Sequence, residues 1–208
     1  MLIGRVLTTA VVIGMSLSAA CGASLYTETW SIAGDLRGWA NTNAAGTVSQ
    51  AEGKVPWNKT STADDAMDVS ADPDASDGAF AGDYTAVGAT HIAFDLTNET
   101  GQNAAPQVYL IGGNGQSVYK ALFLPAPAAL GIGKHYSIPF EEAQWSWESG
   151  PDSFSVVVED VSQVAIYSGG PVGDTASGTL DNVALVPEPT TVILLALGSL
   201  AVITRKKR

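Results

Sequence analysis

Two tryptophans separated by one residue are the first candidates for binding chemistry. Trp145 and Trp147 lie in the stretch AQWSWES, and residues two apart in an extended strand point to the same face. An indole face packs against the apolar face of a pyranose ring, so an exposed pair could stack on two sugar rings. Buried together, the same indoles would be ordinary core residues. Burial in the core is the favoured interpretation, and we keep both as candidate ligand-binding residues.

The titratable residues give little support for catalysis. His91 and His135 each lie in a strand-like pattern and are expected to be structural or surface residues. Glu141 and Glu142 are adjacent, so on a strand they would point apart, whereas the two carboxylates of a glycosidase face each other across a cleft. We therefore expect a protein that is not an enzyme. Carboxylates from distant segments could still meet, which leaves a glycan-acting enzyme as an alternative.

An aspartate-rich stretch, DPDASDG at residues 72–78, raises the possibility of calcium binding. It departs from the EF-hand loop because the fifth position is Ser76, the glycine is displaced and no glutamate follows at the twelfth position. The stretch is better read as a solvated polar loop.

The charge balance limits the class of partner. Residues 24–185 are long enough for one domain with a sizeable core. This part of the chain holds five cations and a large excess of acids, for a net charge of about −15. Nucleic acid is excluded as a partner because binding it needs clustered lysine and arginine. The single cysteine, Cys21, lies outside this domain, so no disulfide can form within it.

Short runs of β-forming residues recur along residues 24–185, separated by Gly, Ser, Thr, Asn and Asp. Several runs alternate, and Ile92, Phe94 and Leu96 are expected to share one face of a strand. Val183 and Leu185 are expected to share one face of a second strand. The segment 152–163 could hold a helical turn, but its three consecutive valines favour a strand. The pattern predicts an all-β, antiparallel β-sandwich.

The two ends of the chain differ from the middle. Residues 1–23 hold one cation, then an apolar run, then small residues, which is the layout of a secretory signal peptide. Cleavage is expected after Ala20 or Ala23. Lipidation at Cys21 is the alternative, although Leu17 lies one residue too early for that pattern.

At the other end, the chain closes with a short apolar segment. The uncharged run 190–204 would rise roughly 22 Å as a helix and is a short candidate transmembrane helix. Four cations follow it and favour the cytoplasmic side of a membrane: Arg205, Lys206, Lys207 and Arg208. Pro187, Glu188 and Pro189 precede it. The two prolines are expected to keep this segment out of helix and strand pairing, and therefore accessible.

This tail, residues 186–208, resembles that of the PEP-CTERM family of exported bacterial proteins. The resemblance rests on the order of the Pro-Glu-Pro motif, the short apolar run and the basic end. It implies an exosortase-type membrane transpeptidase as a partner, with the tail as a sorting tag. It also implies a place in the cell envelope, on the cell surface or in the extracellular matrix, with membrane anchoring until the tail is removed.

The middle of the chain is similar to the jelly-roll domains of exported carbohydrate-binding modules. The stretches that carry this resemblance are YTETWSIAGDLRGWAN near the start, AFAGDYTAVGATHIAFDLTN in the middle and TLDNVALV near the end. The resemblance implies that the first and last strands lie side by side and that Glu28 and Asp181 share one structural Ca²⁺. It further implies that the domain binds or organises extracellular polysaccharide. A structural coat protein with no glycan site is the main alternative.

Overall fold

The computed structural model describes residues 24–43, 45–62, 66–99, 105–124, 133–150, 153–169 and 175–187. The predicted signal peptide, the apolar run 190–204 and the four terminal cations lie outside the described residues, as do Glu188 and Pro189. Within the described ranges, no helix is both long enough and apolar enough to cross a membrane.

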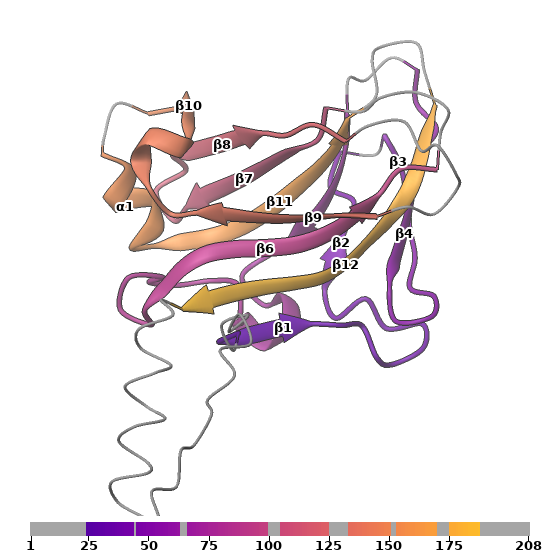
Figure 1. Ribbon diagram of the computed structural model, residues 1–208, viewed down its shortest axis with the longest axis horizontal. Helices are drawn as coiled ribbons and strands as arrows, with labels where there is room; N and C mark the ends of the chain where they lie inside the picture. The colour runs from indigo at the N-terminus through magenta and orange to yellow at the C-terminus, as the bar shows by residue number, and fades with distance from the viewer. Residues whose placement is uncertain are drawn as a thin grey trace, which may run out of the picture.

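The described strands form two antiparallel sheets packed face to face (Figure 1). Sheet A contains, in spatial order, β3 (Gly46–Val48), β4 (Val55–Lys59), β12 (Ala176–Pro187), β6 (Ala89–Thr97) and β9 (Gly133–Pro139), and β1 (Tyr26–Glu28) also pairs with β12. Sheet B contains β10 (Ser146–Ser149), β8 (Ser117–Ala121), β7 (Gln107–Gly112), β11 (Val161–Gly169), β5 (Ala66–Ala71) and β2 (Trp39–Ala40). The predicted all-β, antiparallel sandwich is confirmed.

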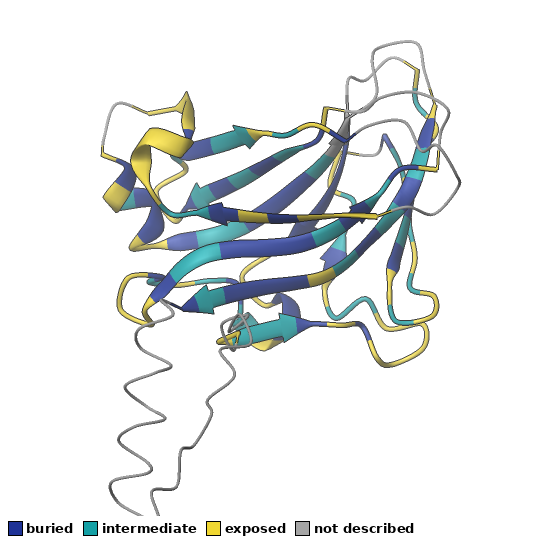
Figure 2. Ribbon diagram, viewed as in Figure 1, coloured by how far each residue is buried: buried dark blue, intermediate teal, exposed yellow. Residues whose placement is uncertain are grey.

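Alternating side chains build the core between the sheets. Ile92, Phe94 and Leu96 of β6 are all buried, as their shared face predicted. On β7, buried Val108 and Leu110 alternate with half-buried residues, and Figure 2 shows the resulting bands along the strand. Burying one side chain of this size contributes about 2 kcal/mol, so the alternation fixes which face of each strand points inward.

Two segments differ from the sequence prediction. Residues Phe154–Val158 form the short helix α1 rather than a strand, because Phe154, Val157 and Val158 recur at helical spacing and all three are buried. Strand β4 was not expected. Its Pro56 lacks a backbone N–H and is unfavourable within a sheet, but Val55 and Trp57 alternate inward and both are buried. In both segments, burial outweighs the local preference.

Gly178 allows β12 to pass close to its neighbours, and this yields a first prediction. A Cβ atom at this position would lie 2.0 Å from the carbonyl oxygen of Thr97 and 2.6 Å from the Trp57 ring. Gly178→Ala should therefore lower the free energy of unfolding by roughly 2 kcal/mol. Urea denaturation checks this, with the neighbouring Ser177→Ala as a control expected to change it by no more than about 0.5 kcal/mol. Equal stabilities for the two variants would contradict the packing described.

The first and last described strands lie side by side, as the resemblance implied. Figure 1 shows β1 beside β12. Tyr26 is opposite Leu185, and the N–H of Leu25 donates to the Leu185 carbonyl at 2.8 Å. The expectation that proline keeps the tail motif out of the sheet was wrong for Pro187. This residue ends β12, is buried and lies opposite Ala89. A proline is tolerated at the end of a strand because few ladder hydrogen bonds remain to be made there.

Candidate functional site

Three tyrosines form a continuous aromatic surface on the outward face of sheet B. We call Tyr109 of β7, Tyr119 of β8 and Tyr167 of β11 the tyrosine strip. The Tyr109 and Tyr119 rings stack at 5.4 Å between centroids, and the Tyr109 and Tyr167 rings lie 4.8 Å apart at a tilt. All three side chains are half-buried, so each keeps part of its ring in solvent.

The strand register produces this strip. β7 lies between β8 and β11, and Tyr109 is directly opposite Tyr119. Side chains alternate between the two faces of a strand, so the buried Val108 and Leu110 on either side force Tyr109 outward. On β11, buried Ile166 does the same for Tyr167. The strip is therefore held on rigid strands and not on a loop.

Polar groups flank the strip. The Tyr109 hydroxyl donates to Oε1 of Gln107 at 2.9 Å, and Gln163 on the same face donates to Asp72 at 2.9 Å. Burial raises the pKa of Tyr109 and of Tyr167, and the negative charge of Glu148 adds to both effects. The phenols therefore stay neutral hydroxyl groups at physiological pH. Aromatic faces beside amides and carboxylates can both stack on a sugar ring and bond its hydroxyls.

The structure does not make Trp145 and Trp147 a matched pair. Trp145 is 8% exposed, packs against Phe140 and Phe154, and donates its indole N–H to the Pro139 carbonyl at 2.8 Å. It precedes β10 and belongs to the core, which is the interpretation favoured from the sequence. Trp147 lies on the edge strand β10 and is 38% exposed. The two indoles therefore do not form one exposed platform.

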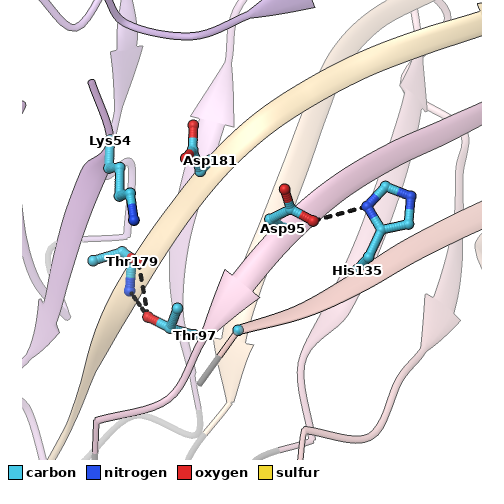
Figure 3. Close-up of a pocket in the computed structure, with 7 residues that line it drawn as sticks. Lys54, Asp95, Thr97, His135, Thr179 and Asp181 are labelled. Carbon is cyan, nitrogen blue, oxygen red and sulfur yellow. Dashed lines mark hydrogen bonds and ion pairs between the residues drawn. The ribbon is translucent and has the colours of Figure 1, made fainter. Parts of the chain in front are cut away.

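A second surface lies on the outward face of sheet A. We call it the polar hollow, a depression of about 310 Å³ across the neighbouring strands β12, β6 and β9, bordered by Lys54 just before β4 (Figure 3). It is lined only by polar residues and one glycine: Lys54, Asp95, Thr97, Gly133, His135, Thr179 and Asp181. It has no aromatic lining, which distinguishes it from the tyrosine strip.

Asp95 is fixed in the polar hollow by two donors on neighbouring strands. Its carboxylate is 2.8 Å from Nδ1 of His135 and accepts from the Asn182 amide at 2.8 Å (Figure 3 draws the first contact). His135 is thus a surface residue, as expected, but one with a specific partner. Asp181 lies directly opposite Asp95 on β12, so both carboxylates point into the hollow.

The environment of Asp181 predicts how the stability of the domain depends on pH. Burial raises the pKa of Asp181 and the charge of Asp95 adds to this, against partial compensation by the Asn182 N–H and Lys54. A raised carboxyl pKa means that ionisation costs stability above that pKa, and the cost is absent at a pH below the ordinary value. Asp181→Asn should therefore keep or increase stability at about pH 7 and have less effect at about pH 3. Thermal denaturation at both values checks this, and a loss of stability at neutral pH would contradict it.

The Glu28 side chain points inward, away from the polar hollow, and its carboxylate is surrounded by hydrogen-bond donors. Its carboxylate accepts from the Ser76 hydroxyl at 2.6 Å, from the Trp30 N–H at 2.9 Å and from the Tyr26 hydroxyl at 2.9 Å. Nε of Arg37 lies 3.6 Å away. Burial opposes ionisation, but the Ser76 and Trp30 hydrogen bonds outweigh it, so the pKa of Glu28 lies below its ordinary value.

The aspartate-rich stretch supplies the donor that closes this network. Its carboxylates, Asp72, Asp74 and Asp77, are exposed as predicted, and Asp77 pairs with Arg37. Ser76 is buried, however, and its hydroxyl contacts both Glu28 and the Trp39 indole N–H at 2.9 Å. The loop is therefore solvated on one side and part of the core on the other.

Glu28 and Asp181 do not fit one shared calcium site. Glu28 lies opposite buried Val183 and its oxygens are taken by protein donors, whereas Asp181 lines the polar hollow on the outer face of the sheet. Among the described residues there is no group of three or more His, Cys, Asp or Glu that could hold a metal ion. Calcium binding by this chain stays a prediction without these two ligands.

The tail of the chain, which begins within the last residues of β12, decides part of its identity. Residues 185–208 match the PEP-CTERM protein-sorting motif. The chain carries a PEP-CTERM sorting motif. The match covers the predicted sorting residues Pro187, Glu188 and Pro189 and the four terminal cations, and it indicates an exported protein that an exosortase processes.

Several solved structures have the same fold as the domain that precedes the PEP-CTERM tail. An agarase, AgWH50C, matches with a TM-score of 0.62 and 11% identity over 81% of this chain, but only 25% of the agarase chain is covered. The family 11 carbohydrate-binding module of a cellulosomal cellulase from Clostridium thermocellum matches with a TM-score of 0.51 and 14% identity, covering 82% of this chain and 96% of the module. The solution structure of CtCBM11 matches with a TM-score of 0.52 and 13% identity, covering 81% of this chain and 98% of that chain.

These likenesses establish the jelly-roll fold of carbohydrate-binding modules for the domain. The chain corresponds to only about a quarter of the agarase chains it matches. No curated protein matches the sequence.

Proposed function

We propose that this chain is an exported, non-catalytic protein that binds polysaccharide through the tyrosine strip. The observation that carries the proposal is the set of three tyrosine rings in contact on neighbouring strands, one pair stacked and one pair tilted, with the Gln107 amide and the Glu148 carboxylate nearby. Successive rings could contact successive sugars of an extended glycan chain. Stacking is favoured because the tyrosine faces are already in place and cost little conformational entropy on binding.

The charge of the domain narrows the class of ligand. The acidic excess of the chain, together with Glu148 beside the strip, would repel uronate or sulfate groups. A neutral polysaccharide rich in hydroxyl groups suits the strip better. Its hydroxyls would form hydrogen bonds with the amide of Gln107, the tyrosine hydroxyls and the carboxylate of Glu148.

The names of two solved structures support the proposal that the domain binds polysaccharide. Two of those with the same fold are carbohydrate-binding modules that match over nearly their whole length. The agarases match over a quarter of their chains, which is consistent with a domain separate from most of the enzyme. At these identities the likeness supports the type of fold, and the ligand has to be argued from the strip.

The sorting motif gives the place where binding would occur. Before tail removal, the chain would be held in the membrane by residues 190–204, and an exosortase-type transpeptidase would then release it or attach it elsewhere in the envelope. The sorted domain would bind or organise extracellular polysaccharide at the cell surface or in the matrix.

Retention of residues 24–187 on a panel of immobilised neutral and anionic polysaccharides tests the proposal. We expect retention on at least one neutral polymer and weaker retention on its anionic counterparts. Running the panel with calcium and then with a chelator shows whether a metal contributes. Failure to be retained on every polymer would favour the alternative of a structural coat protein with no glycan site.

A glycan-acting enzyme is the second candidate, favoured by one observation. Asp95 and Asp181 are paired across β6 and β12 in the polar hollow, which places their Cβ atoms roughly 5 Å apart. Glycosidases use two facing carboxylates, one of which has a raised pKa, as Asp181 does. Asp95 is, however, already bonded by His135 and Asn182. Release of reducing ends from a retained polymer, lost in Asp181→Asn, would establish this candidate, and no release is the result expected of a binding module.

A further inference from the structure

The sorting motif begins inside the folded domain. Its match starts at Leu185, and Pro187, the first residue of the Pro-Glu-Pro segment, is buried at the end of β12 opposite Ala89. The preceding residue is held as well, because the Thr90 hydroxyl donates to the Val186 carbonyl at 3.2 Å. The chain therefore does not leave the domain before the motif starts.

The same end of the sandwich also holds the start of β1. The Leu25 N–H bonds to the Leu185 carbonyl, so the residues that follow the predicted signal peptide lie beside those that precede the motif (Figure 1). Two large aliphatic side chains are exposed near these ends. Leu25 is 45% exposed, and Val87, in the turn just before Ala89, is 57% exposed.

The spacing between the fold and the predicted membrane segment is short. Only Glu188 and Pro189 separate buried Pro187 from the uncharged run that begins at Thr190. Two residues span at most about 7 Å when fully extended. With residues 190–204 in the membrane before processing, the folded domain would sit directly against the membrane surface, and the end that carries Leu25 and Val87 would face it. A processing enzyme needs an accessible length of chain, and cleavage sites in folded proteins generally require local unfolding.

We propose that the folded domain keeps its sorting motif latent. The Val186–Pro187 end of β12 must detach from Thr90 and Ala89 before the transpeptidase can engage the Pro-Glu-Pro segment. The rate of sorting is then set in part by the local stability of this strand end. The membrane-facing end is the surface that carries the exposed side chains of Leu25 and Val87, beside buried Pro187, and its partner before processing is the lipid bilayer. The inference is independent of sugar binding, because it rests on the sorting motif and the contacts of β12.

Pulse-chase labelling of the full-length chain in cells that contain an exosortase tests this, with loss of the tail followed by mass. One variant carries Gly-Ser-Gly-Ser inserted between Val186 and Pro187, which moves the intact motif away from the sheet. Thr90→Val removes the bond to the Val186 carbonyl. The matched control carries the same insertion between Asn114 and Gly115, in an exposed turn far along the chain from the motif.

We expect the Val186/Pro187 insertion to shorten the half-time of tail loss severalfold and Thr90→Val to shorten it less. The Asn114/Gly115 insertion should leave it unchanged. An unchanged or longer half-time for the Val186/Pro187 insertion would overturn the proposal. An equal acceleration by the control insertion would overturn it too, since general destabilisation would then account for the effect.

Discussion

Replacing Tyr109 by alanine should remove most of the affinity of the domain for its polysaccharide. Tyr109 is the central ring of the tyrosine strip and contacts both Tyr119 and Tyr167. Truncating a central aromatic contact typically costs about 2 kcal/mol or more, which is roughly thirtyfold in Kd. Affinity electrophoresis in gels containing the retained polymer measures this directly.

Tyr109→Phe is the matched control. It keeps the ring and loses only the hydroxyl that donates to Gln107, so its Kd should change by much less than that of the alanine variant. Circular dichroism should show that both variants are folded. A folded Tyr109→Ala that binds as well as the wild type would remove the tyrosine strip as the binding surface.

Glu28→Ala should have the largest effect on stability, lowering the free energy of unfolding by roughly 4 kcal/mol. The substitution leaves the Ser76 hydroxyl and the Trp30 N–H without their acceptor and removes the counter-charge of Arg37. Urea denaturation checks the value. Glu142→Ala, at an exposed position, serves as a control and should change stability by no more than about 0.5 kcal/mol.

The pH dependence of stability tests the same network. Because the pKa of Glu28 is lowered by folding, its contribution is complete above the ordinary carboxyl pKa and is lost as the pH falls through the lowered value. Glu28→Gln should therefore flatten the loss of stability between about pH 5 and pH 3. If the wild type and Glu28→Gln lost stability in parallel over this interval, the carboxylate would not be held as described.

The fold was largely predictable because its information is local. Alternation in β6 and β7 identifies which side chains face inward, and turn residues separate the strands. α1 was missed because three consecutive valines favour a strand in isolation. Its helical form depends on burial of Phe154, Val157 and Val158 against the rest of the domain.

The candidate site was less predictable because side-chain direction depends on distant contacts. Trp145 is drawn into the core by Phe140 and Phe154. Tyr109, in contrast, could have been recognised, since it lies between buried Val108 and Leu110 in an alternating strand. Its meeting with Tyr119 and Tyr167 across three strands required the sheet order, which the sequence alone does not provide.

The positions of Glu28 and Asp181, the two predicted calcium ligands, show how a single bulge changes the direction of a side chain. β1 and β12 pair as the family resemblance implied, and residues 181 and 183 would share a face in a regular strand. The register of β12 shifts between Asp181 and Ala184, where Asn182 adopts a positive φ of 52°. This bulge turns Asp181 outward while Val183 and the opposing Glu28 face inward. Sequence alternation does not reveal a bulge of this kind.

The most direct test of the account is a fluorine NMR titration of the 3-fluorotyrosine-labelled domain. The ligand is an oligosaccharide cut from the polymer that retains the domain. The chain has six tyrosines, so Tyr26, Tyr84 and Tyr136 provide internal controls away from the strip. We expect the resonances of Tyr109, Tyr119 and Tyr167 to shift together on titration while the other three stay in place. Saturable binding that leaves those three resonances unmoved would contradict it, as would the absence of any polymer that retains the domain.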